Sequence, residues 1–146
     1  MKVFLASDHA GYELKEVLNT FLTEHKIPAE DLGPHAFNPN DDYTEYMFAL
    51  ASAVVGEKGS FGIGIGGSGQ GEAMAVNRVK GARASVFYGG NIDVLKVSRK
   101  DNGANVLCLG ARFLSQDEAK RAVEYWLKTP FSNEERHMRR IQKLDT

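Results

Sequence analysis

Cysteine is nearly absent from this chain, which has 146 residues and a single cysteine, Cys108. One cysteine excludes a disulfide within the chain and any metal site built from several thiolates. Cys108 lies in the apolar run 105–110, so we expect a buried structural thiol. The chain has only four histidines, and no spacing of His, Asp and Glu is typical of metal ligands. We therefore predict no metal.

Long apolar runs are also missing, since none approaches the roughly 18 residues that a membrane helix needs. Asp8 and His9 come too early for the charged-then-apolar layout of a secretory signal. Charge of one sign is not in excess either, because 18 Lys and Arg face 19 Asp and Glu, for a net charge of −1. The sequence gives no electrostatic reason to bind nucleic acid or an anionic membrane, and we expect a cytoplasmic protein.

The residues that are present are typical of a folded enzyme-sized domain. Hydrophobic residues make up 42% of the chain, with 8 Phe and 5 Tyr, which excludes intrinsic disorder. The length predicts a single domain over residues 1–146.

Short apolar runs alternate with amphipathic stretches along the chain. The pattern predicts strands at 2–7, 27–32, 61–65, 82–88 and 106–109. It predicts helices at 12–25, 43–56, 72–78, 92–99 and 115–128, and a last charged helix from Ser132 onward. Strands separated by helices indicate an α/β, Rossmann-like domain, with a five-stranded, mainly parallel sheet and helices on both faces. Ligands of such sheets bind beyond the carboxyl ends of the strands, where Asp8, Ser68 and the segment after Leu109 fall.

The strongest local motif is the glycine loop 66–71, which has glycine at positions 66, 67, 69 and 71. Four glycines let backbone N–H groups turn toward one point, and a helix follows, so the loop suits an anion or a developing oxyanion. It is not a nucleotide P-loop, because no Gly-Lys-Ser/Thr follows. The alternative is a tight turn without a ligand.

Glu72 and Ser68 are candidate catalytic residues beside this loop. Glu72 in the first helical turn is explained either by the helix dipole alone or as a general base next to an oxyanion cradle. Ser68 either hydrogen-bonds a substrate oxygen or only closes the turn.

Asp8 and His9 form a second candidate, since they follow the first strand directly. Either they contact a ligand, or Asp8 caps the next helix and His9 packs in a loop.

Arg136 and Arg140, one helical turn apart, form a third. Two guanidiniums on one face suit a phosphate clamp, which Arg112 could join. The alternative is a solvated basic face.

Together these motifs resemble the ribose-5-phosphate isomerase type B family, which includes the subunits of galactose-6-phosphate isomerase. The resemblance runs through nearly the whole chain. It rests on segment 7–15 (Ser-Asp-His-Ala-Gly-Tyr-Glu-Leu-Lys), Asp42-Tyr43, segment 66–72 with Asn77, Ser98-Arg99, Asn102, segment 105–107, Gly110, Arg112 and segment 136–140.

The resemblance implies an isomerase that interconverts an aldose phosphate and a ketose phosphate through a cis-enediolate, without a cofactor. Many members use a cysteine just before the Gly-Ser/Thr-Gly loop, but that position here is Gly66. Another subgroup uses a glutamate at the end of the loop, which matches Glu72. We therefore expect Glu72 to be the base and Ser68 to assist proton movement at the substrate oxygens.

The resemblance also implies a substrate site shared by two subunits of a homodimer, or of two dimers paired into a tetramer. The last helix would then lie across the partner. The implied substrate-binding residues are Asp8, His9, Tyr43, Gly67, Ser68, Gly69, Gln70, Gly71, Asn102, Arg112, Arg136 and Arg140.

One position departs from the family, where a histidine assigned to furanose ring opening precedes the matching Asn102. Here the residue is Asp101, and an aspartic acid of ordinary pKa is a poor acid near neutral pH. Either Asp101 has a raised pKa, His9 takes over, or the substrate needs no ring opening. Ribose 5-phosphate is the first expected substrate, and an acyclic tetrulose 4-phosphate or a hexose 6-phosphate comes next.

Two other classes of function compete with an isomerase. A phosphosugar-binding module without catalysis would keep the arginines and lack a proton-transfer step. A nucleotide-binding Rossmann protein is less favoured, because the glycines follow the third strand and no acidic residue is placed for a ribose.

Overall fold

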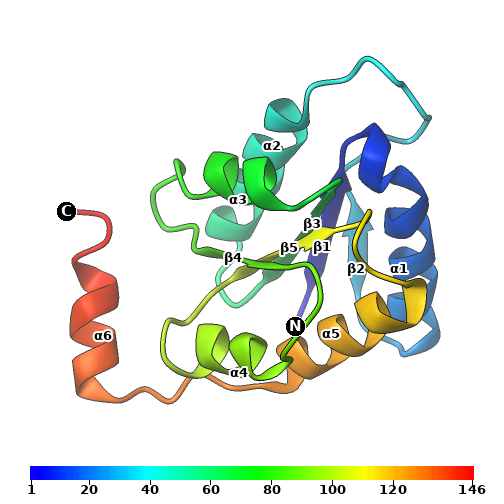
Figure 1. The fold of residues 1–146 in the computed structure, drawn as a ribbon. Helices are drawn as coiled ribbons and strands as arrows, with labels where there is room; N and C mark the ends of the chain where they lie inside the picture. The colour runs from blue at the N-terminus through cyan, green and yellow to red at the C-terminus, as the bar shows by residue number, and fades with distance from the viewer.

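The computed structural model describes all residues from Met1 to Thr146 and contains one five-stranded sheet (Figure 1). Every pair of neighbouring strands is parallel, and the strand order is β2-β1-β3-β5-β4. This confirms the predicted α/β, Rossmann-like fold. The strands are β1 (Val3–Ser7), β2 (Ala29–Asp31), β3 (Phe61–Gly66), β4 (Ala84–Phe87) and β5 (Val106–Gly110).

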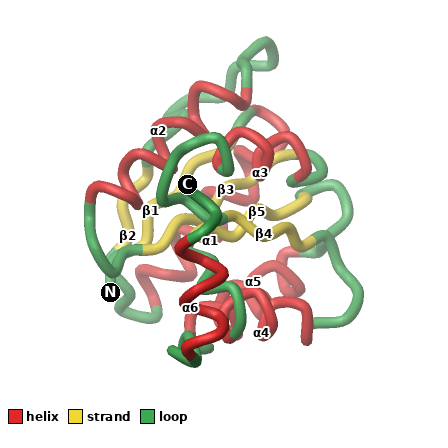
Figure 2. Tube along the Cα trace, turned by 90° about the vertical axis from the view of Figure 1, so that its left-hand side faces the viewer, coloured by secondary structure: helices red, strands yellow, loops and turns green.

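Helices cover both faces of the sheet, as the alternating pattern predicts. The helices α2 and α3 lie on one face, and α1, α4 and α5 lie on the other (Figures 1 and 2). Their bounds are α1 (Tyr12–Glu24), α2 (Tyr43–Gly56), α3 (Gln70–Val76), α4 (Asp93–Lys100), α5 (Gln116–Lys128) and α6 (Glu135–Gln142), with a short 3-10 helix η1 (His9–Gly11) before α1. None of these helices is both long and apolar enough to cross a membrane.

Two hydrophobic cores lie on the two sides of the sheet, because successive strand residues point to opposite faces. Leu5, Ile63 and Leu107 are fully buried in the core under α1, α4 and α5. Phe4 and Cys108 belong to the second core, under α2 and α3. Cys108 is fully buried, which confirms the prediction of a structural thiol.

Two helices begin two or three residues away from the predicted start. The helix after the glycine loop begins at Gln70 instead of Glu72, since Gly69 with φ of 81° starts it two residues earlier. The last helix begins at Glu135 instead of Ser132, because the backbone N–H of Ser132 bonds the carbonyl of Lys100 at 3.0 Å and Asn133 has a φ of 60°. The second and fourth strands are shorter than predicted, at 29–31 and 84–87.

Helix α6 stands apart from the two helical layers, at the edge where the strands begin (Figure 1). His137 is its one buried residue. A groove of about 720 Å³ lies between α6 and the strand starts, with Phe61, Met138 and Ile141 among its lining residues. This largest cavity is at the opposite edge of the sheet from the glycine loop.

Candidate active site

The carboxyl ends of β1, β3 and β5 meet at one point of the sheet edge. The backbone N–H of Asp8 donates to the carbonyl of Ile65 at 3.3 Å, and that of Ala111 donates to the carbonyl of Gly66 at 2.8 Å. Arg112 donates its backbone N–H to Gly67 at 3.1 Å. The three segments that carry sequence candidates are therefore joined by backbone hydrogen bonds, which fixes the site on a rigid scaffold.

The glycine loop turns sharply between β3 and α3. The backbone N–H of Gln70 donates to Oγ of Ser68 at 3.2 Å, so this hydroxyl closes the turn. A Cβ at position 110 would lie 2.7 Å from the carbonyl oxygen of Ser68, so the loop packs directly against the end of β5. Ser68 therefore closes the turn, which is one of the two roles expected for it. Its hydroxyl lies beside the glycine loop in the same position.

The carboxylate of Glu72 lies over Gly66. A Cβ at position 66 would overlap Oε1 of Glu72 and lie 2.7 Å from Oε2. Glu72 is 4% exposed, so its carboxylate is buried within the first turn of α3. The space that a side chain at position 66 would occupy is therefore filled by the end of the Glu72 side chain.

Burial raises the pKa of the Glu72 carboxyl above its ordinary value, and the negative charge of Asp8 raises it further. Hydrogen bonds from the backbone and the charge of Arg112 act in the opposite direction. Glu72 lies close enough to Cys108 to contribute, after burial, to the raised pKa of that thiol. A buried carboxyl whose pKa is raised by burial and a neighbouring charge is a candidate for proton transfer.

Two larger side chains cover Gly71 and Gly67 of the loop. A Cβ at position 71 would lie 2.8 Å from Cζ of Tyr43, and one at position 67 would lie 3.0 Å from Cζ of Arg112. Arg112 is exposed, so its guanidinium stands at the rim of the site. Tyr43 and Arg112 thus lie beside the loop.

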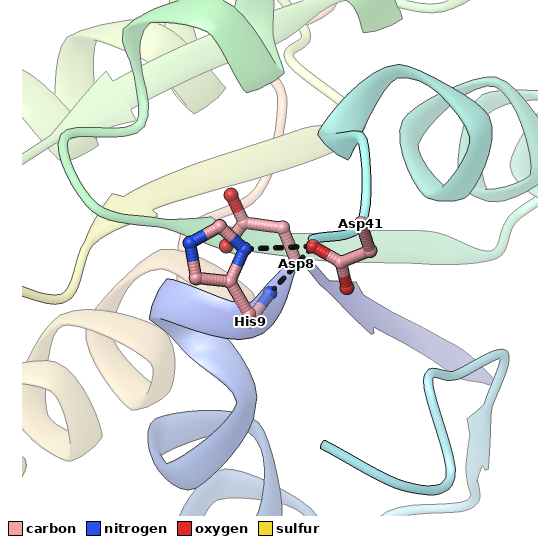
Figure 3. A group of neighbouring side chains, drawn as sticks. All are labelled: Asp8, His9 and Asp41. Carbon is pink, nitrogen blue, oxygen red and sulfur yellow. Dashed lines mark hydrogen bonds and ion pairs between the residues drawn. The ribbon is translucent and has the colours of Figure 1, made fainter. Parts of the chain in front are cut away.

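Asp8 and His9 lie at the same edge of the sheet (Figure 3). Asp8 is 7% exposed and accepts a hydrogen bond from the backbone N–H of Gly11 at 3.1 Å. His9 bonds Asp41, a residue that the sequence analysis did not identify. No sequence signal marks Asp41, because the contact joins residues 32 positions apart.

Two carboxylates and one imidazole lie close together here, those of Asp8, Asp41 and His9. Their ligand atoms lie within 4.8 Å of one another, which is the one such grouping in the chain. However, Nδ1 of His9 and Oδ1 of Asp41 are already hydrogen-bonded at 2.8 Å. A metal ion there would have to replace that hydrogen bond.

The remaining candidates lie at the other edge of the sheet. Asp101, Asn102 and Arg140 line a pocket of about 230 Å³ with His137. Nε2 of His137 is 3.5 Å from Oδ1 of Asp101. Arg136 pairs with Glu134 at 3.0 Å. A single chain therefore brings together the glycine loop, Glu72, Asp8, His9, Tyr43 and Arg112, and separates them from Asp101, Asn102, Arg136 and Arg140.

The sequence model of the ribose/galactose isomerase family matches residues 3–144. Ribose-5-phosphate isomerase B of Mycobacterium tuberculosis is 37% identical over 144 residues, covering 99% of this chain and 88% of that protein. The probable ribose-5-phosphate isomerase B of Mycoplasma genitalium is 39% identical over 145 residues, covering 97% and 92% of the two chains.

Solved structures give the same result. The crystal structure of ribose-5-phosphate isomerase B from Mycoplasma genitalium with bound ribulose-5-phosphate has a TM-score of 0.92 and 38% identity, covering 98% of this chain and 93% of that one. The enzyme from Thermotoga maritima has a TM-score of 0.91 and 35% identity, covering 99% and 97%. The agreement of sequence, fold and coverage confirms the resemblance seen in the motifs, and the chain belongs to the ribose/galactose isomerase family of enzymes.

Proposed function

We propose that the chain interconverts ribose 5-phosphate and ribulose 5-phosphate, a step of the pentose phosphate pathway, with Glu72 as the base. The observation that carries the proposal is the buried Glu72 carboxylate of raised pKa, held against the glycine loop at the strand ends. The names of the relatives and the ribulose 5-phosphate in the Mycoplasma genitalium structure support this choice of substrate.

The proposed reaction moves protons and needs no redox cofactor. Glu72 takes the proton from C2 of the open-chain aldose, and the electron pair forms the C1–C2 double bond of a cis-enediolate. The same carboxyl returns the proton to C1, while Ser68 assists proton movement between the two oxygens. Backbone N–H groups of the glycine loop stabilise the negative oxygen as it develops. Because burial raises the pKa of Glu72, its carboxylate is a stronger base for the abstraction step.

The proposed phosphate site needs a second copy of the chain. Arg112 stands at the rim of the Glu72 site, whereas Arg136 and Arg140 lie on α6 at the other edge. Since α6 buries only His137 against its own chain, we place its arginines, with Asn102, over the partner's glycine loop. The active form is then a homodimer, or a tetramer of two dimers, with each site built from both subunits.

The test follows the C2 proton of ribose 5-phosphate by proton NMR in deuterated buffer. The intact protein should exchange this proton and form ribulose 5-phosphate. Glu72→Gln should slow both by roughly 10²–10⁴-fold, because general-base catalysis is lost. Glu45→Gln is the matched control, since Glu45 is an exposed carboxylate in the first turn of α2. Near-full activity of Glu72→Gln would show that another group is the base.

A second candidate substrate, an aldotetrose 4-phosphate, is favoured by the environment of Asp101. Oδ1 of Asp101 is 3.5 Å from Nε2 of His137, so this carboxylate already interacts with an imidazole of its own chain. A sugar phosphorylated at C4 has no free hydroxyl there to close a five-membered ring, so it needs no ring opening. If this is the substrate, Asp101→His should leave tetrose turnover almost unchanged and improve turnover of ribose 5-phosphate. If the chain exchanges no C2 proton of pentose, tetrose or hexose phosphates, it is a module that binds phosphosugars without catalysis.

A further inference from the structure

We propose that Asp41 is a positioning residue, which holds the His9 imidazole so that Nε2 faces the substrate. Oδ1 of Asp41 accepts two hydrogen bonds from His9, one from the backbone N–H at 3.1 Å and one from ring Nδ1 at 2.8 Å. Figure 3 shows both bonds on one side of His9, with Nε2 on the far side of the ring. This inference rests on the proposed function, because it assumes that His9 contacts the sugar phosphate.

The burial of Asp41 argues against a carboxylate that merely happens to lie nearby. Its side chain is 4% exposed, and Oδ2 is buried without a hydrogen-bond partner. Taking a carboxylate out of water is costly unless it is paired. All the hydrogen bonds of this carboxylate go to His9. The two hydrogen bonds from His9 are therefore the only ones that offset the burial of this carboxylate.

Asp41 itself is held in place by the chain around it. Its backbone N–H bonds the carbonyl of Asn38 at 3.3 Å, and Asn40 bonds the Asn38 side chain at 3.0 Å. Helix α2 begins two residues later, at Tyr43, the residue that covers Gly71 of the glycine loop. The same short segment thus positions His9 on one side and a wall of the glycine-loop site on the other.

The bond to Asp41 determines which ring nitrogen of His9 can work on a ligand. A carboxylate only accepts, so Nδ1 must carry the proton and Nε2 is left to exchange one. The His9 side chain is 33% exposed, and Phe37 packs against it edge-on with ring centroids 6.4 Å apart. Asp8, the neighbour of His9 in the chain, lies close enough to Glu72 for its charge to act on that carboxyl. His9 and Glu72 therefore both lie at the edge of the sheet where β1 and β3 end.

The direct test is the tautomer of His9, measured by ¹⁵N NMR on the protein without substrate. The intact chain and the Glu45→Gln control should show the tautomer with the proton on Nδ1. Asp41→Ala should show a mixture, because the acceptor is gone. Asp41→Asn should restore much of the original signal, since an amide oxygen can accept the same two bonds. An unchanged His9 signal in Asp41→Ala would overturn the proposal.

Kinetics supply a second readout that a purely structural role would not give. Asp41→Ala should lower kcat/KM for ribose 5-phosphate by about 10–100-fold, because misplacing a contacting group by about 1 Å costs up to that much. In the double variant with His9→Gln, the Asp41 substitution should add little further loss. Additive losses would contradict an action through His9. If Asp41→Ala does not fold, Asp41→Ser, whose side chain is too short to reach Nδ1, replaces it.

The two proposals fail in different ways. If the intact chain does not isomerise ribose 5-phosphate, the proposed function is wrong, and the tautomer still decides whether Asp41 positions His9. If the chain is active and the tautomer does not respond to Asp41→Ala, only the positioning role is wrong.

Discussion

At the scale of single residues, the site depends on one small volume, which the Glu72 carboxylate fills and a side chain at position 66 would also need. Glu72 reaches back from the first turn of α3 and places its carboxylate where a side chain at position 66 would begin. Only glycine leaves that space free. The location of the Glu72 carboxylate therefore depends on the missing side chain at position 66 as much as on the rotamer of Glu72.

Gly66→Ala tests this arrangement. The added methyl must displace the Glu72 carboxylate, so we expect kcat to fall by about 10–100-fold, in line with the loss for a misplaced catalytic group. Gly56→Ala is the matched control, because a Cβ there meets no atom within 4 Å. Steady-state kinetics on both variants give the comparison, and equal activity of the two would mean that Glu72 is not held as the structure shows.

The raised pKa of Glu72 predicts opposite effects of pH on activity and on stability. The base must be ionised, so kcat/KM should rise with pH through a pKa above the ordinary value for glutamate. Folding favours the protonated carboxyl, so this contribution to stability is complete at pH values below the unfolded-state pKa and is lost as pH rises through the folded-state pKa. Glu72→Gln cannot ionise, and its melting temperature should gain on the intact chain as pH rises.

Melting curves of both proteins from about pH 4 to about pH 8 measure this difference. A gap in melting temperature that stays constant with pH would contradict the raised pKa.

At the scale of the element, the start of α3 determines where Glu72 lies. Gly69 has φ of 81° and directly precedes Gln70, so the helix begins early enough for Glu72 to occupy its first turn. Other residues adopt this left-handed conformation at a cost of roughly 1–2 kcal/mol. A Cβ at Gly69 would also lie 3.1 Å from Val86 and 3.2 Å from the backbone of Leu109.

Gly69→Ala should therefore lose both stability and activity. Gly59 offers the matched control, since its φ of 83° is nearly the same and a Cβ there meets nothing within 4 Å. Urea unfolding should show a loss of roughly 1–2 kcal/mol for Gly59→Ala and more for Gly69→Ala. Only Gly69→Ala should lower kcat. If both variants keep full activity, the exact start of α3 does not matter for catalysis.

At the scale of the whole molecule, the proposed site residues are divided between two edges of one sheet. Glu72 follows the end of β3, whereas Arg136 and Arg140 lie on α6 beside the strand starts. Two copies arranged about a twofold axis can bring opposite edges together, because each subunit then gives its partner what it receives.

Mixing two defective chains tests this arrangement. Glu72→Gln and the double variant Arg136→Ala, Arg140→Ala should each have little activity alone. Refolded together, the mixed dimers should hold one intact site each, which restores about a quarter of the intact protein's activity for random pairing. Activity no higher than the mean of the two parents would place all the residues of a site in one chain.

The fold could be predicted from sequence, and so could the grouping of Asp8, Ser68 and Arg112 at one edge of the sheet, and particular residues show why. The spacing of hydrophobic residues predicts the strands and helices, because an element that is buried on one face has apolar residues at regular intervals. The start of α5 leaves a local signal of this kind, because its capping box joins Ser115 to Glu118, only three positions apart. Asp41 could not be predicted, because its contact with His9 follows from how two loops meet. The start of α3 at Gln70 depends on one backbone angle, which leaves no periodic signal.

The volume shared by Gly66 and Glu72 has a consequence for how such sequences can change. Any side chain at position 66 and the carboxylate of Glu72 compete for the same space, so each restricts what the other position can hold. A larger residue at position 66 would need a shorter or displaced side chain at position 72. The effects of substitutions at the two positions should therefore be epistatic, since the first change alone crowds the Glu72 carboxylate or removes it.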